Sequence, residues 1–328
     1  MSGVNYSIPE TLKIDPQTLS ILRFRSLLIN ALPAVGFVVA CLLVLKQGIS
    51  SFHINLFILF YALTFIGIEV GFHRYFSHGS FQTTVWLEHV LATLGCWGGQ
   101  GPVLYWAASH RRHHKHADTE QDPHSPHFSP GRRDGPLARF LHSHMNWIFS
   151  KEVSNPLFYT RDLVAKNRLS RYSNNYLVIV FSGILLPGLI ALFCLHSFSE
   201  AALAVLYAGV ARLCLVQQVT FCINSVCHLL GDRPNNTHAF STNNVLLAIP
   251  SLGGAWHNNH HASPSSAYID FRWWQIDIGG YFIRLLALLG LAWNIKEKPK
   301  IQKMLNDSHK QHPPRLLMPN LLSCCFNF

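Results

Sequence analysis

The chain has 328 residues, of which 49% are hydrophobic and 13% are charged, with a mean hydropathy of +0.19 and a formal net charge of +10. This hydropathy is high for a soluble protein and predicts an integral membrane protein. The positive charge is concentrated in two long polar segments, so we interpret it as a topology signal and expect no binding to nucleic acid.

The chain begins with a polar segment, residues 1–25, which lacks the pattern of a cleaved secretory signal. Four apolar stretches follow, each close to the roughly 20 residues that cross a bilayer. They run at about 27–45, 54–72, 176–196 and 201–222. Short turns join the first to the second and the third to the fourth, which predicts two hairpins of transmembrane helices. Two paired spans of this length argue against the alternative of buried helices in a large soluble core.

Charge predicts the orientation of these hairpins. Segment 73–175 carries about a dozen Lys and Arg, and the chain from 223 onward carries about nine more, whereas the short turns hold almost none. The positive-inside rule then places both long segments and both termini in the cytoplasm. We expect a membrane domain over 26–298 with a cytoplasmic cap from 73–175 and 223–298, followed by a tail over 299–328. Arg212, inside the fourth stretch, should face the protein interior, because a charge is unfavourable in lipid.

Eight histidines form three tight groups, HRYFSH, HRRHH and HNNHH. Their members are His73 and His78; His110, His113 and His114; and His257, His260 and His261. In HxxHH the histidines stand at i, i+3 and i+4, so both such groups should lie on helices with their imidazoles on one face. Imidazole binds iron, zinc, copper and nickel, and eight ligands are too many for one ion. We therefore predict a pair of metal ions on the cytoplasmic side.

The donor set narrows the choice of metal. The cysteines show no CxxC spacing of a zinc or iron–sulfur site. The HExxH motif of zinc hydrolases is also absent from the sequence. Neutral imidazoles leave a high positive charge on the metals, with open positions for oxygen, so paired iron that activates O₂ fits best.

In this order, spaced around two hairpins, the three groups resemble those of membrane fatty-acyl desaturases of the stearoyl-CoA desaturase type. The resemblance covers about 25–298 and includes GFHRYFSH, HRRHHKHAD and GGAWHNNHH followed by WWQID. It implies an all-α integral membrane fold whose cytoplasmic helical cap holds two Fe²⁺ ions. It also implies an O₂-dependent enzyme that inserts a cis double bond into a saturated acyl chain, with acyl-CoA and the delta-9 position expected.

The resemblance also implies further site residues. An NxxxH motif after the fourth stretch would add the metal ligands Asn224 and His228. A bent acyl tunnel would be lined near the metals by Gln100, Trp106 and Thr220, with Tyr61 and Phe65 as candidates for its far end. Candidate contacts to carrier phosphates are Arg111, Arg112, Lys115, Arg132 and Arg133. These five cations could equally be solvated or face lipid headgroups.

The chain departs from the family pattern before its third histidine group. The family often has Gly-Glu-Gly or Gly-Glu-Ser with an aromatic there, whereas this chain has Gly253, Gly254, Ala255 and Trp256. The missing glutamate is not a metal ligand in the family, so we expect the iron site to persist. What that carboxylate would hold, a metal-bound histidine being one candidate, is left open.

Each turnover needs two electrons from outside the chain. The sequence has no His-Pro-Gly-Gly haem motif, no ferredoxin cysteines and no glycine-rich nucleotide fingerprint. We therefore expect a separate ferredoxin or small haem cytochrome, with its reductase, as a partner beside membrane lipid.

Several alternatives stay open at this point. A hydroxylase, acetylenase or ketolase would use the same scaffold, and the acyl chain could be linked to coenzyme A, a lipid or a carrier protein. A histidine-rich metal transporter is a distant alternative. Transport needs ionisable residues within several spans, whereas these histidines cluster on one side.

Overall fold

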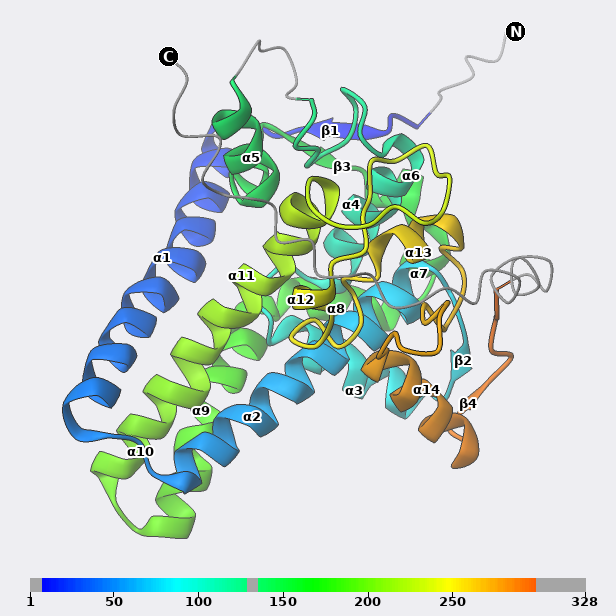
Figure 1. Cartoon of the computed structure of the whole chain (residues 1–328). Helices are drawn as coiled ribbons and strands as arrows, with labels where there is room; N and C mark the ends of the chain where they lie inside the picture. Colours follow the sequence, from blue (N-terminus) through cyan, green and yellow to red (C-terminus); the bar gives the residue numbers. More distant parts are fainter. Residues whose placement is uncertain (1–7, 129–134, 299–328) are drawn as a thin grey trace, which may run out of the picture.

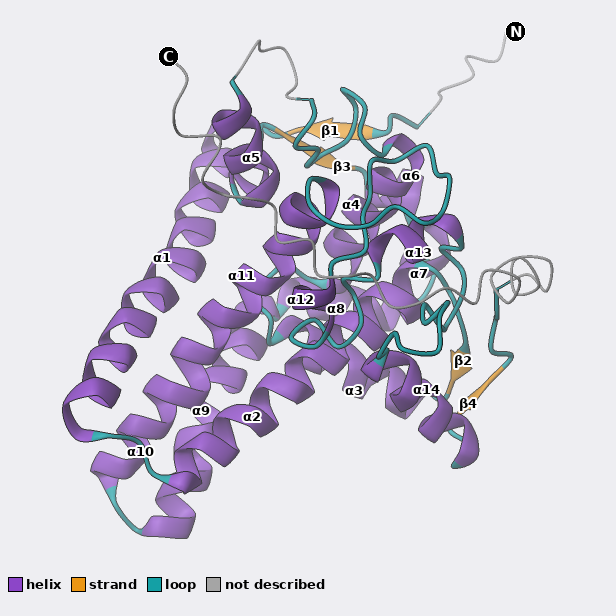
Figure 2. Ribbon diagram, in the orientation of Figure 1, coloured by secondary structure: helices purple, strands orange, loops and turns teal. Residues whose placement is uncertain are grey.

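The computed structural model describes residues 8–128 and 135–298, and these form a mostly helical protein (Figures 1 and 2). Four of its helices are long and apolar enough to cross a membrane: Pro16–Gln47, Ser51–Ser77, Tyr176–Leu195 and Phe198–His228. Each contains all or nearly all of one apolar stretch predicted from the sequence. The predicted all-α fold with four membrane helices is confirmed.

The four long helices form two hairpins. The first joins α1 (Pro16–Gln47) to α2 (Ser51–Ile66), which continues as the π-helix η1 (Gly67–Ser77). The second joins α9 (Tyr176–Leu195) to a helix made of α10 (Phe198–Ala204), the π-helix η4 (Val205–Ala211), α11 (Arg212–Ser225) and the 3₁₀-helix η5 (Val226–His228). The two connecting turns lie at the same end of the bundle, at the lower left of Figure 1.

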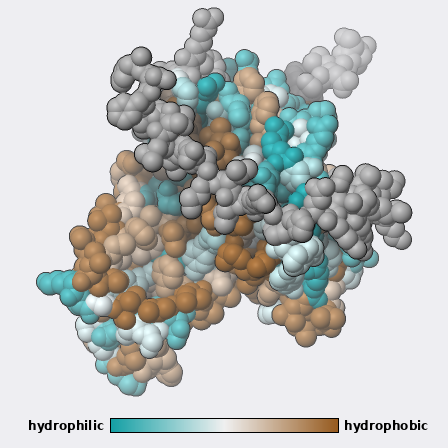
Figure 3. All heavy atoms as spheres, viewed as in Figure 1, coloured by the Kyte–Doolittle hydropathy of each residue, from teal (hydrophilic) through white to brown (hydrophobic). Residues whose placement is uncertain are grey.

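Apolar side chains cover the outer faces of this bundle, where Figure 3 shows hydrophobic residues gathered at the lower left. Exposed members on α1 are Leu28, Leu32, Val35, Val38, Val39, Leu42 and Leu45, and on α9 they are Val178, Phe181, Leu185, Leu186, Leu189 and Phe193. An apolar surface of this extent suits contact with lipid rather than with water. All backbone polar groups inside a bilayer need internal partners, which continuous helices supply.

Arg212 lies in the middle of the fourth membrane helix and is fully buried. Its guanidinium donates hydrogen bonds to the carbonyls of Ala208, Trp97 and Gly183 and to Oγ1 of Thr64. The prediction that this charge faces the protein interior is confirmed. Arg212 therefore links three helices of the bundle to the end of α3 (Val85–Cys96).

The remaining described elements form the cap, in the upper and right parts of Figure 1. Its other helices are α4 (Val103–His116), α5 (Pro136–His144), η2 (Asn146–Phe149), α6 (Pro156–Tyr159), α7 (Arg161–Val164), η3 (Asn167–Leu169), α8 (Ser170–Asn174), α12 (Val245–Ala248), α13 (His257–Ala262) and α14 (Ile278–Leu288). Two small antiparallel ribbons tie distant segments together: β1 (Thr11–Lys13) with β3 (Glu152–Ser154), and β2 (Gln82–Thr83) with β4 (Ala292–Trp293).

The N-terminal boundary predicted at residue 25 differs from the structure. Helix α1 begins at Pro16, because Asp15 caps it by accepting a hydrogen bond from Thr18 N and proline suits a first helical position. A helix of 32 residues is about 48 Å long, well beyond the roughly 30 Å hydrocarbon core. Its first turns therefore reach the cap, where Thr11–Lys13 pairs with β3. The predicted tail, 299–328, lies outside the described residues.

Close packing against α3 fixes the position of η1. A Cβ atom on Gly67 would lie 2.1 Å from the backbone nitrogen of Gly95, and one on Gly95 would lie 2.4 Å from the ring of Phe72. Only glycine allows the two backbones to approach this closely. The contact holds in place the helix that carries the first histidine pair.

Glu88 on α3 is the centre of a buried ionic network. It accepts hydrogen bonds from Tyr75 Oη at 2.6 Å, Lys166 Nζ at 2.7 Å and Arg168 Nε at 2.6 Å. Burial alone would raise the pKa of this carboxyl, but the hydrogen bonds from Arg168 and Lys166 outweigh burial and lower the pKa to about 2. Because the unfolded carboxyl has a higher pKa, the network stabilises the fold above about pH 4.5, and this stabilisation is lost as pH falls toward 2.

We expect Glu88→Gln to destabilise the protein by about 2–3 kcal/mol at pH 7.5, because it removes the charge that Lys166 and Arg168 share. Thermal unfolding in detergent micelles, followed by tryptophan fluorescence, measures the difference. At pH 3 the difference from wild type should fall below half of its value at pH 7.5. An equal difference at both pH values would show that the loss is one of packing and not of charge.

Candidate metal centre

Nine histidines from four segments converge where the cap meets the membrane helices. Helix α4 carries the HRRHH group and α13 carries the HNNHH group, so the prediction that both groups lie on helices is confirmed. The first pair comes from η1 and the residue after it, and the ninth histidine, His228, ends η5.

The π-helix explains how the first pair can act together. Residues five apart on an α-helix point about 140° away from each other. In η1 the wider turn closes i to i+5, and the backbone N–H of His78 donates to the carbonyl of His73 at 3.2 Å. The two rings then lie 5.1 Å apart between centroids. The HxxxxH spacing therefore requires this irregular turn.

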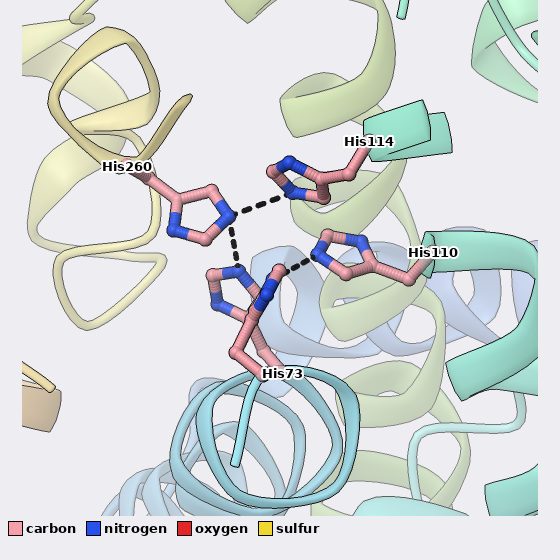
Figure 4. Close-up of side chains that lie close together, drawn as sticks. His73, His110, His114 and His260 are labelled. Atoms are coloured by element: carbon pink, nitrogen blue, oxygen red, sulfur yellow. Dashed lines mark hydrogen bonds between the residues drawn. The ribbon is translucent and has the colours of Figure 1, made fainter. Parts of the chain in front are cut away.

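Five of the histidines form one group, which we call the five-histidine cluster. Its members are His73, His78, His110, His114 and His260, each with a ring nitrogen within 4.8 Å of the others. His260 Nε2 lies 2.9 Å from His73 Nε2 and 2.8 Å from His114 Nε2, while His78 Nε2 lies 2.8 Å from His110 Nε2. Figure 4 shows His260 reaching from α13 toward His73 and His114.

The other four histidines form the four-histidine cluster, whose members are His113, His228, His257 and His261. The Nε2 atom of His257 lies 3.1 Å from those of His228 and His261, and His113 Nε2 lies 3.2 Å from His261 Nε2. Each HxxHH helix thus gives an i, i+4 pair to one cluster and its middle histidine to the other.

The geometry of both clusters fits metal ions. Two nitrogens bound at right angles with bonds of about 2.1 Å would lie about 3.0 Å apart, and the Nε2 separations are 2.8–3.2 Å. Two imidazole nitrogens this close, with both lone pairs converging, need a shared proton or a metal between them. The residues present could therefore hold two ions, one in each cluster.

Electrostatics favours the neutral imidazole that a metal requires. Burial, reinforced by the neighbouring histidines, holds the pKa well below its usual value for His78, His110, His114, His257, His260 and His261. A ring that stays unprotonated keeps its lone pair for coordination. The sites are therefore prepared to bind a cation before it arrives.

Three carboxylates hold histidines of the clusters from behind, and sequence analysis missed all three. Glu69 accepts from His73 Nδ1 at 3.0 Å, Asp122 accepts from His113 Nδ1 at 2.9 Å, and Asp118 accepts from His228 Nδ1 at 2.8 Å. Each bond places the proton on Nδ1 and leaves the Nε2 lone pair facing its cluster. The sequence did carry a signal: Glu69 stands four residues before His73, and Asp118 and Asp122 stand four and eight residues after His114.

The loop after α4 is organised by Asp118 and Asp122. Burial raises the pKa of each carboxyl, but contacts with His228 and His113 outweigh it; the pKa of Asp118 is lowered to about 2, and that of Asp122 is lowered further. Burial likewise lowers the pKa of His113, but Asp122 outweighs burial and the net effect is to raise it. Both carboxylates therefore stay charged throughout the physiological pH range.

A small cavity of about 40 Å³ adjoins both clusters. It is lined by the predicted residues Asn224, Trp106, Thr220 and Phe65, together with Glu69 and Gly254. This volume holds about one water molecule and no acyl chain. The structure thus brings Asn224 to the site, while its role as a ligand and the tunnel itself stay predictions.

Two of the predicted tunnel residues do not line this cavity. The Tyr61 ring packs against that of Phe65 at a tilt of 40°, and its hydroxyl donates a hydrogen bond to the carbonyl of Pro250 at 2.8 Å. The side-chain Nε2 of Gln100 is buried without a partner among the described residues.

The candidate phosphate contacts are mostly engaged within the protein. Arg111 uses all five of its N–H donors, on the carbonyls of Ser77, Phe76 and Tyr159 and on both carboxylate oxygens of Asp162. All of its donors are thus engaged within the protein, and contact with a carrier phosphate stays a prediction. In the same region, Arg112 donates to Gln121 O and Lys115 pairs with Glu10. Arg132 and Arg133 lie outside the described residues.

Arg111→Met is expected to destabilise the fold by about 1–3 kcal/mol, because it leaves three carbonyls at the junction of η1, α4 and α6 without their hydrogen-bond donor. Arg112→Met, which removes one hydrogen bond to a loop, is the matched control and should change stability by less than half as much. Thermal unfolding in detergent compares the two. Equal losses would mean that the Arg111 network contributes nothing beyond an ordinary surface contact.

Comparison with known proteins agrees with this site. The model of the fatty acid desaturase family matches residues 50–278. The chain is 39% identical over 274 residues to hex-5-enoyl-[acyl-carrier protein] acetylenase of Moorena producens (strain JHB), covering 82% of this chain and 85% of that protein. It is 33% identical to icosanoyl-CoA 5-desaturase of Limnanthes douglasii, covering 77% and 67% of the two chains. It is 34% identical to delta-9 acyl-lipid desaturase 1 of Arabidopsis thaliana, covering 74% and 75%.

The family model spans three of the four membrane helices and all three histidine groups, which argues against the metal-transporter alternative. The chain belongs to the fatty acid desaturase family.

Proposed function

We propose that this protein is an O₂-dependent di-iron enzyme that inserts a cis double bond into a fatty acyl chain. The observation that carries the proposal is the pair of buried histidine clusters, whose Nε2 atoms converge with separations that suit two metal ions. Within this class, the sequence resemblance favours a saturated acyl-CoA substrate and the delta-9 position.

Iron held by the two clusters would supply the activation of O₂ that C–H bond cleavage requires. The chain itself would position the substrate. Trp106 and Thr220 line the small cavity beside both clusters, and an acyl chain bound against these two side chains would place its methylene groups next to the histidines. Such positioning can supply several kcal/mol of the barrier reduction.

The number of electrons that the reaction consumes shows that the enzyme needs an electron-donor protein. Removal of two hydrogens from the chain, with reduction of O₂ to two water molecules, consumes two further electrons and two protons. We infer that a separate ferredoxin or small haem cytochrome with its reductase supplies these electrons. Positive-inside charge favours a cytoplasmic cap, where such a donor could dock.

A second candidate is favoured by one specific observation. The relative at 39% identity is named as an acetylenase that acts on a chain attached to acyl-carrier protein. Formation of a triple bond removes two hydrogens from an existing double bond and needs the same metals and electrons. Together, the two candidate reactions leave three possible carriers for the acyl chain: coenzyme A, a lipid or a carrier protein.

The test is to express the chain and its His257→Ala variant in a desaturase-deficient host that supplies iron and a working donor. Saturated and cis-monoenoic fatty acids are fed separately, and mass spectrometry identifies the products and the positions of their double or triple bonds. A new monoene from the saturated acid, made only by the intact chain, supports desaturation and gives its position. A product two hydrogens lighter than the monoene, with a triple bond at the carbons of the original double bond, supports the acetylenase instead. Neither product, or an oxygenated one, would overturn both candidates.

A further inference from the structure

The structure offers an account of the residue that the third histidine group lacks. Gly254 stands three residues before His257, where the family often has glutamate. The space beside Gly254 is filled by another acidic side chain: a Cβ on Gly254 would lie 2.8 Å from Oε2 of Glu69. Glu69 comes from η1 and is separated from Gly254 by 185 positions in the sequence.

Glu69 is buried and placed to orient a metal ligand. It is 6% exposed, and its Oε1 accepts a hydrogen bond from His73 Nδ1 at 3.0 Å. It lines the same cavity as His73, Gly254 and His257. Its carboxylate therefore touches both the first histidine group and the position of the missing glutamate.

A buried arginine fixes the conformation of Glu69. Arg74 donates to Glu69 Oε1 from Nε at 3.2 Å and from Nη2 at 3.0 Å, and it binds both carboxylate oxygens of Asp277 at 2.7 and 3.0 Å. Arg74 also donates to the carbonyl of Ala267 at 2.7 Å. An ion network this buried, with its partners all engaged, holds its members in one geometry.

Two glycines provide the room for this network. Besides Gly254, a Cβ on Gly279 would lie 3.2 Å from Cγ of Glu69 and 3.3 Å from Nη2 of Arg74. A glutamate at position 254 would meet Glu69 directly, placing two carboxylates in contact in a buried space. Glutamate at 69 and glutamate at 254 therefore exclude each other.

We infer that Glu69 is a positioning residue for the five-histidine cluster, and that its carboxylate, which comes from η1, fills the space beside Gly254 and so takes the place of an acid at that position. This rests on the proposed iron site. It acts by holding the proton of His73 on Nδ1, so that Nε2 faces the metal.

The experiment compares wild type with Glu69→Ala, Glu69→Gln, Gly254→Glu and the double variant Glu69→Ala/Gly254→Glu. Gly135→Glu, at an exposed position with open space, is the control for adding an acid. Each purified protein is loaded with ⁵⁷Fe²⁺ alone. Iron per chain after dialysis against a chelator and the Mössbauer spectrum are then recorded, without substrate or electron donor.

Both Glu69→Ala and Gly254→Glu should retain at least tenfold less iron in one of the two sites, and the double variant should recover most of it. Glu69→Gln keeps the shape of the side chain and should alter the quadrupole splitting of one iron signal only. Bound iron is measured only on protein that purifies in a folded state. Recovery of iron binding in the double variant therefore supports the inference even if one single variant folds poorly.

Full iron retention with an unchanged spectrum in Glu69→Ala would overturn the inference, as would a double variant no better than the worse single variant. A wild type that binds two irons but forms no acyl product would refute the proposed reaction and leave the role of Glu69 intact.

Discussion

His260→Ala is expected to lower the bound iron to about one ion per chain and to reduce acyl-chain activity by roughly 100-fold or more. His260 is the only member of the five-histidine cluster that comes from α13. Its Nε2 contacts those of both His73 and His114, and the side chain is 1% exposed. Alanine would remove a ligand that contacts both η1 and α4 and would leave a cavity beside His73 and His114.

Metal analysis of the purified protein measures the iron, and product formation in the desaturase-deficient host measures the activity. The matched control is His196→Asn. His196 is exposed and has a left-handed backbone conformation at the end of α9, which asparagine also adopts readily. The control should keep both iron and activity. Two irons retained in His260→Ala would exclude His260 as a ligand.

The regular parts of the fold and site were predictable because they follow local rules. Apolar runs of about 20 residues predict membrane helices, and HxxHH spacing predicts ligands on one helix face. The existence of a histidine-rich metal site also followed from the sequence, since three patterned groups exceed what packing needs. Even His228 was found, although only through the family resemblance.

The rest depended on contacts that sequence spacing cannot show. HxxxxH gives no sign that a π-helix will bring His73 and His78 together. The division of each HxxHH group between two clusters depends on how α4 and α13 face each other. Glu69 was hidden because it lies within an apolar stretch far from its counterpart Gly254. The internal hydrogen bonds of Arg111 could not be predicted either, because its partners come from three separate segments.

Asp122→Asn is expected to weaken iron binding at the four-histidine cluster by about 10- to 100-fold. The carboxylate is fully buried and both of its oxygens are acceptors. Oδ2 accepts from His113 Nδ1 and from the backbone N–H of Asp118, and Oδ1 accepts from the backbone N–H of His124. Asparagine offers only one acceptor oxygen, so its NH₂ group must face at least one of these donors.

This conflict should turn His113 away from its cluster or move the loop, at a stability loss of about 1–3 kcal/mol. Iron titration followed by Mössbauer spectroscopy would locate the loss at one of the two sites. Glu120→Gln, an exposed acid on the same loop, is the control and should bind both irons normally. The pKa of Asp122 lies well below its usual value, so wild type keeps this charge from pH 6 to 8. Because Asp122 also raises the pKa of His113, protons compete with iron at His113 more strongly in wild type than in Asp122→Asn. The iron affinity of wild type relative to the variant should therefore increase from pH 6 to pH 8, and a relative affinity that falls over that range would contradict this role of Asp122.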